Sequence, residues 1–316
     1  MPLKQAQLAV LYLQFFFELI GLGLYTLYIL LKKSLLILLP GPLKSVKNEV
    51  ILVTGGANGI GREICRHIAR YETCLTIISW DIDVVGNQNL RNELEALGVK
   101  KTMVSTVDVS NQKQVEAAAR KIRQEIGDVT ILFNNAGIPG DLGEGWTNEP
   151  DSVKKVFNVN FLSHCWTIRE FLPGMLKRKT GHIVETCSIL AFGAAPSGSS
   201  YVASKQAMNG YIESIKEDLR NLTDENQVLI SLVYPHNTAT NLTAGAELQA
   251  RKYHFLFPQL LPSYVASKIL YGVLRNQEHI YVPGYLRLFH SILPILPPET
   301  IRKCIDVADI HRVDEL

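Results

Sequence analysis

The chain has 316 residues, 47% of them hydrophobic and 20% charged, which is enough for one substantial α/β domain with appendages but not for two full-sized domains. Its formal net charge of +2 and the lack of a basic stripe interleaved with aromatic residues argue against a nucleic-acid partner. The five cysteines are odd in number and form no C-x-x-C or metal-like pairing with histidine, so we expect buried thiols in a reducing compartment and no metal site.

The first predicted element is a membrane segment, residues 8–31, whose only strongly polar members are Gln14, Glu18 and Thr26. Its length can cross a bilayer, and no small-x-small cleavage site follows it, so we expect a retained anchor helix. Lysines are more frequent after the segment than before it, which places the following domain on the cytoplasmic side. Because an ionised Glu18 is costly inside a bilayer unless it pairs with Gln14 or reaches water, a hairpin or an interfacial helix is the alternative.

The domain opens with a short apolar run, VILV at 50–53, then glycines, then a helical pattern over 60–69. In TGGANGIG the glycines allow a tight turn and a close approach to a pyrophosphate, next to the N–H groups of a helix N-terminus. This arrangement predicts a dinucleotide site, and a turn with helix-packing glycines is the alternative. The candidate cofactor contacts in the turn are Thr54, Gly55, Asn58, Gly59, Ile60 and Gly61.

A second strand, LTIISWD, ends at Asp81, about 20 residues beyond the last glycine, where a carboxylate can accept hydrogen bonds from both ribose hydroxyls. The same carboxylate repels a 2′-phosphate, and Asn58 adds no compensating charge, so NAD is favoured over NADP. The alternative is that Asp81 is the N-cap of the helix predicted over 84–97.

A third strand, TMVSTVDVS, places Asp108 and Val109 at its C-terminal end, where an adenine edge could meet Asp108. Equally, Asp108 or Ser110 could cap the helix that starts near Asn111. The fourth strand, DVTILFNNAG, brings Asn135, Ala136 and Gly137 to the same edge of the sheet.

The stretch from Ser188 to Lys205 carries the chemistry. If a helix begins at Tyr201, Lys205 lies one turn along on the same face, and its ammonium lowers a phenol pKa that is otherwise about 10. Tyr201 then becomes a usable acid or base, and Ser188 can hydrogen-bond the same substrate oxygen. Tyr-x-x-x-Lys alone is a weak motif, because amphipathic helices carry it by chance.

Three ordered motifs, TGGANGIG, NNAG, and Ser188 with YVASK, resemble the short-chain dehydrogenase/reductase family over residues 48 to about 285. The resemblance implies an α/β fold with a single Rossmann-type, doubly wound parallel sheet of about seven strands. It also implies that NNAG shapes the floor of the cofactor site, and that Asn160 holds a water that contacts Lys205. From the residues alone, Asn160, in a long helix expected over 151–177, could instead satisfy neighbouring backbone.

The chain departs from the family pattern in two strands. Glu185 and Thr186 stand in GHIVETCS, which usually stays apolar up to the serine, so we expect them to alter a neighbour of the site or to face outward. His236 replaces the glycine of a usual Pro-Gly after the sixth strand, and we do not expect it to be a base. The resemblance implies that Pro235 and Thr238, or Thr240, contact the nicotinamide there.

Residues 241–262, rich in Leu, Phe and Tyr beside two basic residues, are expected to form a substrate lid, or else a packed core helix. A helix near 262–276, a seventh strand in IYVPG and an apolar tail follow. The anchor, WDI, and VPGYL with a following LP look like the membrane-bound retinol dehydrogenase and 17-beta-hydroxysteroid dehydrogenase subgroup. The resemblance implies hydride transfer between NAD and a lipophilic alcohol or carbonyl on the endoplasmic reticulum or lipid droplets.

The sequence therefore predicts an anchor and linker over 1–47, an NAD-binding enzyme domain over 48–285 that includes the lid, and an apolar extension over 286–316. A non-catalytic NAD-binding scaffold is the alternative function, and a homodimer is possible by analogy with the family. The chain ends in VDEL and has sequons at Asn221 and Asn241, which would suit a lumenal domain, against the cytosolic one that the lysines indicate. The catalytic residues expected are Asn160, Ser188, Tyr201 and Lys205.

Overall fold

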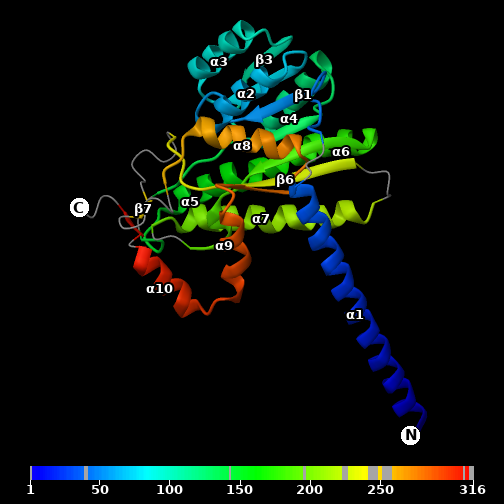
Figure 1. Cartoon of the computed structure of the whole chain (residues 1–316). Coiled ribbons are helices and arrows are strands. Elements are labelled where there is room, and N and C mark those ends of the chain that lie inside the picture. The colour runs from blue at the N-terminus through cyan, green and yellow to red at the C-terminus, as the bar shows by residue number, and fades with distance from the viewer. Residues whose placement is uncertain are drawn as a thin grey trace. The chain divides into compact units, whose positions relative to one another are not determined.

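A computed structural model describes residues 2–38, 42–141, 144–194, 197–222, 227–240, 248–250, 258–308 and 310–312. The chain divides into two compact units, Met1–Lys44 and Ser45–Leu316. The first unit contains α1 (Pro2–Leu38), drawn in dark blue in Figure 1. Its stretch Gln7–Lys32 is long and apolar enough to cross a membrane. Gln14 Nε2 donates to Glu18 Oε1 at 3.1 Å, so the carboxylate has the partner one turn away that we expected.

The second unit is built on a parallel sheet of seven strands in the order β3-β2-β1-β4-β5-β6-β8. The predicted fold class is confirmed. The strand order reverses between β1 and β4, and in such sheets ligands bind in the crevice outside the carboxyl ends of the strands at that point. The strands are β1 (Val50–Thr54), β2 (Thr76–Asp81), β3 (Lys101–Thr106), β4 (Ile131–Asn134), β5 (Thr180–Thr186), β6 (Gln227–Pro235) and β8 (His279–Val282).

Helices cover both faces of the sheet, and helices and strands alternate along the coloured chain in Figure 1. Ile51 and Val53 pack with α2, α3 and α8 on one face, whereas Leu52 packs with α4, α6 and α7 on the other. Burial on both faces explains why the strands are apolar runs rather than alternating patterns. The helices are α2 (Gly59–Tyr71), α3 (Val84–Ala96), α4 (Gln112–Glu125), α5 (Pro150–Phe157), α6 (Ser163–Arg178), α7 (Ser199–Arg220) and α8 (Pro262–Leu274).

The long helix predicted over 151–177 is present and runs without a break from Pro150 to Arg178, but it is not α-helical throughout. A π turn over Asn158–Leu162 joins α5 to α6. Such a turn widens the helix locally and is frequent at functional sites. Asn160 lies in it and is fully buried.

The C-terminal part contains α9 (Leu286–Ile292), a 3₁₀ turn over Leu293–Ile295, and α10 (Pro298–Ala308). A second small sheet pairs β7 (Leu248–Ala250) with β9 (Ile310–Arg312) in antiparallel fashion. Most of the predicted lid, at 241–247 and 251–257, lies outside the described residues, as do the terminal VDEL and the sequon at Asn241.

Four of the five cysteines have described side chains, and these four are free thiols. Cys65 and Cys187 are buried as predicted, whereas Cys74 and Cys165 are half-buried. Burial raises the pKa of the Cys65 thiol to about 12, so this thiol stays protonated and unreactive near neutral pH.

Candidate active site

The glycine turn between β1 and α2 has the shape that a pyrophosphate requires. Gly55 and Gly59 have φ of +67° and +53°, in the left-handed region that favours glycine. A Cβ on Gly61 would lie 2.1 Å from the Gly55 carbonyl oxygen, so this position admits no side chain. α2 begins at Gly59, and Asn58 at its N-cap makes no side-chain cap hydrogen bond. The first N–H groups of a helix have no partner within the helix, so the turn fits a bound phosphate group.

The NNAG segment is hydrogen-bonded to this turn. Thr54 Oγ1 accepts hydrogen bonds from the main-chain N–H of Asn135 at 3.0 Å and of Ala136 at 3.1 Å. Asn135 Nδ2 donates in return to the carbonyl oxygens of Thr54 and Gly55. The ends of β1 and β4 are therefore joined at the switch point, and Gly137 continues from there. The structure brings these predicted cofactor contacts together.

Asp81 lies at the end of β2, at the lip of the glycine turn. Its Oδ2 accepts from the Ala57 N–H and its Oδ1 from the Asp83 N–H, each at 2.9 Å. The cap of α3 is Asp83, which accepts from the Gly86 N–H, so Asp81 is not the N-cap. The hydrogen bond from the Gly86 N–H lowers the pKa of the Asp83 carboxyl, and a smaller contribution in the same direction comes from the hydrogen bond with Asn58. Two carboxylates thus stand at the β2–α3 turn.

The residues after β3 show whether Asp108 or Ser110 caps the next helix, which the sequence left open. Asp108 Oδ1 accepts from the main-chain N–H and the hydroxyl of Ser110. Neither residue is the N-cap of α4, because Asn111 caps it through its side-chain oxygen. Val109 packs in the core on the α4 face, so its side chain does not enter the crevice. Asp108 is half-buried at the strand end, where it was predicted.

Ser188, Tyr201 and Lys205 come together where β5 ends and α7 begins. Lys205 lies one turn after Tyr201, with its Nζ 5.7 Å from the centre of the tyrosine ring, and donates at 2.8 Å to the carbonyl oxygen of Thr186. Ser188 is the N-cap of a 3₁₀ turn, and its Oγ accepts from the Leu190 N–H at 3.2 Å. The Ser188 side chain also hydrogen-bonds the Tyr201 phenol. The predicted shared face of α7 is confirmed.

The phenol pKa differs from the expectation. Burial raises the pKa of Tyr201 to about 12, and the hydrogen bond with Ser188 only partly opposes this. Tyr201 as a whole is half-buried, but desolvation of the phenolate is the largest contribution to its pKa. Burial also lowers the pKa of Lys205, whose ammonium points at the Thr186 carbonyl. The pKa of Tyr201 therefore lies above its ordinary value rather than below it as we expected, and the phenol is protonated at neutral pH.

The side chain of Asn160 hydrogen-bonds main-chain atoms, which is the role that the residues alone suggested for it. Its Oδ1 accepts from the Ile138 N–H at 2.8 Å and its Nδ2 donates to the Ile138 carbonyl at 2.9 Å. The same Nδ2 donates to Ser204 Oγ at 3.1 Å, and Ser204 precedes Lys205 in α7. Asn160 thus ties the segment after NNAG to the helix that carries the lysine.

The loop after β6 reaches the same edge of the sheet. Thr238 is buried and donates through Oγ1 to the His236 carbonyl at 2.8 Å. Burial lowers the pKa of His236, which favours the neutral imidazole. A Cβ on Gly59 would lie 3.1 Å from the Thr240 methyl group, so Thr240 lies against the glycine turn. Pro235 ends β6 as predicted.

The position of Glu185 excludes one of the two expectations for it. It is fully buried, so the possibility that it faces outward is wrong, and Thr186 is only 6% exposed. Glu185 pairs with His164, a residue that sequence reasoning did not select. The signal that could have pointed to this pair is a carboxylate inside an otherwise apolar strand, which requires a buried partner.

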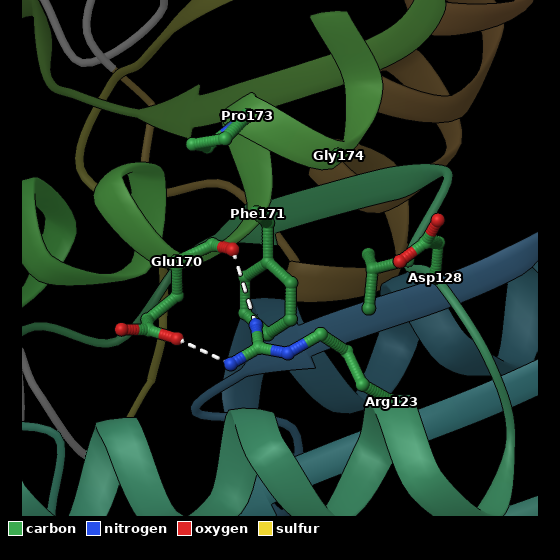
Figure 2. A pocket seen from close by; sticks show the side chains of 7 residues that line it. Arg123, Asp128, Glu170, Phe171, Pro173 and Gly174 are labelled. Carbon is green, nitrogen blue, oxygen red and sulfur yellow. Dashed lines mark hydrogen bonds and ion pairs between the residues drawn. The ribbon is translucent and has the colours of Figure 1, made fainter. Parts of the chain in front are cut away.

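A separate cavity of about 280 Å³ lies at the other end of β4 (Figure 2). Arg123 Nη2 donates to Glu170 Oε2 at 2.8 Å, and Arg123 Nη1 donates to the Glu170 carbonyl at 3.2 Å. Asp128 and Val129 line the cavity and precede β4, whereas NNAG begins with Asn134, the last residue of β4. The cavity therefore does not belong to the candidate site. Its other lining residues are Phe171, Pro173 and Gly174.

Comparison with known proteins agrees with this geometry. The family described as short chain dehydrogenase matches residues 49–251. Human epidermal retinol dehydrogenase 2 is 31% identical over 276 residues, covering 87% of this chain and 87% of that protein. Estradiol 17-beta-dehydrogenase 11 of Rattus norvegicus is 32% identical over 260 residues, covering 82% and 84%. Human 17-beta-hydroxysteroid dehydrogenase 13 is 30% identical over 282 residues, covering 89% and 90%.

Solved structures are similar as well. A short-chain dehydrogenase/reductase from Burkholderia phymatum in complex with NAD has a TM-score of 0.69 and 25% identity, covering 80% of this chain and 96% of that chain. A metagenomic short-chain oxidoreductase in complex with NADP has a TM-score of 0.61 and 25% identity, covering 75% and 96%. The chain is therefore an oxidoreductase of the short-chain dehydrogenase/reductase family, and it resembles the retinol and 17-beta-hydroxysteroid dehydrogenases within it.

Proposed function

We propose that the protein transfers a hydride between NAD and a lipophilic alcohol or carbonyl of the retinol or hydroxysteroid class. The observation that carries the proposal is the meeting of Ser188, Tyr201 and Lys205 at the edge of the sheet where the glycine turn lies. In this proposal residues 48–285 form the enzyme domain, 1–47 the anchor and linker, and 286–316 an apolar extension. The names of the similar retinol and steroid dehydrogenases support the substrate class.

Tyr201 is the proton-transfer group in this mechanism. A nicotinamide cofactor held by the glycine turn through its pyrophosphate would supply the hydride acceptor for a carbinol carbon, or the hydride donor for a carbonyl carbon. In oxidation the alcohol proton moves to the Tyr201 oxygen, and in reduction the protonated phenol gives its proton to the carbonyl oxygen. A pKa of about 12 supplies the protonated form that reduction needs. The nearby Lys205 ammonium favours the deprotonated form that oxidation needs.

Three further residues support this transfer. Ser188 is hydrogen-bonded to the phenol, so its hydroxyl is placed to hold and polarise the same substrate oxygen. Lys205 is fixed by the Thr186 carbonyl, from where we propose that its remaining protons bind the nicotinamide ribose. Asn160 links the NNAG side to α7, and we propose that it completes the path along which a proton reaches solvent.

We propose a preference for NAD over NADP because the Asp81 carboxylate meets the ribose. Asp81→Asn keeps a side-chain oxygen for the Ala57 N–H and removes the charge, so the ratio of kcat/KM for NAD to that for NADP falls by about tenfold or more. Steady-state kinetics with both cofactors measures this ratio. Asp108→Asn, at the end of the neighbouring strand, is the control and leaves the ratio unchanged. An unaltered ratio in Asp81→Asn would contradict the assignment.

We propose that α1 holds the protein in the endoplasmic reticulum membrane or on lipid droplets, with the domain in the cytosol. The apolar surface of α1 and the lysines after it support this. The full chain is expected to stay in the membrane fraction after alkaline extraction, whereas a variant without residues 2–44 is released. Glycosidase treatment leaves the mass of the full chain unchanged. A glycosidase-sensitive mass would place Asn221 or Asn241 in the lumen and overturn this orientation.

The enzyme assignment is tested by the formation of NADH. Detergent-solubilised full-length protein receives NAD or NADP together with retinol, an oestradiol-like steroid or a long-chain alcohol. Turnover of one of these with NAD is the expected result. Cofactor binding without turnover across the panel would overturn this substrate class and favour a non-catalytic scaffold.

A further inference from the structure

Four buried polar side chains form one connected cluster inside the apolar layer between the sheet and α6. They are at most 1% exposed, and apolar neighbours such as Leu132 and Ile183 occupy the same layer. Burying polar groups costs free energy unless each finds a hydrogen-bond partner. We call these residues the buried polar cluster: Asn134, His164, Thr167 and Glu185.

The members of the cluster bond to one another. Glu185 lies directly opposite Asn134 in the β4–β5 register, and its Oε1 accepts from Asn134 Nδ2. Glu185 Oε2 pairs with His164 Nδ1 at 2.7 Å. Thr167 Oγ1 donates at 2.7 Å to Asn134 Oδ1. Both oxygens of the carboxylate are therefore engaged, which offsets the cost of its burial.

The surroundings of His164 define its protons. Its Nε2 lies 3.0 Å from the carbonyl oxygen of Ala136, which can only accept, so Nε2 carries a hydrogen. Its Nδ1 faces a carboxylate, so one further proton lies between His164 and Glu185. The pair is then either imidazolium with carboxylate or imidazole with carboxylic acid. Both forms have no net charge, so the pair can remain buried without an unpaired ion.

The cluster ends on the floor of the cofactor site. The carbonyl of Ala136 is bound by His164, and the N–H of the same residue donates to Thr54 Oγ1. The Ala136 Cα would lie only 3.0 Å from a Cβ on Gly55, so the two main chains are in close contact. A shift of Ala136 therefore deforms the glycine turn. Stability alone does not explain the cluster, because apolar residues of similar volume usually serve a core at least as well.

We propose that Glu185 and His164 are positioning residues for the cofactor. Through the Ala136 carbonyl they hold the NNAG segment against the glycine turn. Neither side chain contacts the reacting atoms in this role. The inference rests on the proposed function, in which this turn binds NAD.

The test compares two replacements of Glu185 in the full-length protein. In Glu185→Gln the amide oxygen accepts from Asn134 and the amide N–H₂ donates to His164 Nδ1, so both bonds survive without the acid. In Glu185→Leu both bonds are lost and His164 has no partner at Nδ1. The NADH Kd, measured by fluorescence without substrate, rises about tenfold in Glu185→Leu and stays within about twofold of wild type in Glu185→Gln.

The matched control is His182→Leu. His182 is in the same strand, is equally buried, and bonds Ser231 Oγ at 2.8 Å, but it faces β6 rather than NNAG. This variant loses a buried hydrogen bond and lowers the Tm, while its Kd for NADH stays unchanged. If His182→Leu raises the Kd as much as Glu185→Leu, the effect is one of general stability and the proposal fails.

Other outcomes also decide the matter. His164→Gln is a milder change, because the glutamine amide can bond either the Ala136 carbonyl or Glu185 but not both. We expect it to give an intermediate Kd for NADH, and it provides the measurement if Glu185→Leu does not fold. An unchanged Kd for NADH in Glu185→Leu and His164→Gln, or an equal rise of the Kd in Glu185→Gln and Glu185→Leu, overturns the role of these hydrogen bonds. If wild-type protein itself does not bind NADH, the proposed function fails instead, so the two failures are distinguishable.

Discussion

Tyr201→Phe lowers kcat by about 10³-fold or more while the protein still folds and binds NADH. Phenylalanine keeps the ring beside Lys205 and removes only the oxygen that gives or takes the substrate proton. The variant also loses the hydrogen bond with Ser188. That loss is small beside the loss of the acid and base, because Ser188 Oγ still accepts from the Leu190 N–H. Single-turnover kinetics and NADH fluorescence measure the two quantities separately.

The control for Tyr201→Phe is Tyr211→Phe in the same helix. Tyr211 packs its ring edge-to-face against Phe161, with 5.7 Å between ring centres, and its hydroxyl neighbours Cys165. Removing this hydroxyl leaves kcat close to the wild-type value. Appreciable turnover by Tyr201→Phe with either cofactor would remove Tyr201 from the mechanism.

Much of the fold follows from local sequence patterns. The strands are short apolar runs because both faces of the sheet are covered, and the glycines that follow β1 have room for no other residue at Gly61. Tyr201 and Lys205 were placed on one face by helical spacing alone, and the structure confirms that face. Such features depend on neighbours within a few positions along the chain, which a single sequence contains.

Other features depend on groups that are distant in the sequence. Glu185 pairs with His164, 21 positions away. A carboxylate in an apolar strand requires a buried partner, but nothing local to Glu185 identifies that partner as His164. The pKa of Tyr201 depends on how much protein covers the phenol, which spacing does not give. Short-range competition also left the helix caps open, and the structure excludes the alternative in which Asp81 caps α3. Asp83 rather than Asp81 caps α3, since both carboxylates stood within reach of its first turn.

Gly61→Ala is expected to remove cofactor binding and to destabilise the domain. A Cβ there would lie 2.1 Å from the Gly55 carbonyl oxygen and 2.7 Å from Asn135 Nδ2, and neither can retreat without opening the turn. The Asn135 amide holds that turn through the carbonyls of Thr54 and Gly55, so the clash acts on the phosphate cradle itself. We expect the Kd for NADH to rise by about 100-fold and the free energy of unfolding to fall by about 1–3 kcal/mol.

Gly210→Ala separates this steric effect from the general effect of adding a methyl group to a helix. Gly210 lies in α7, and a Cβ there meets nothing within 4 Å. Alanine is the better helix former, so this variant is expected to gain about 0.5–1 kcal/mol of stability and to bind NADH as the wild type does. Chemical denaturation and NADH titration of both variants measure the contrast. If Gly61→Ala bound NADH as tightly as Gly210→Ala, the pyrophosphate could not lie against the turn, because that turn cannot keep its shape around a side chain at position 61.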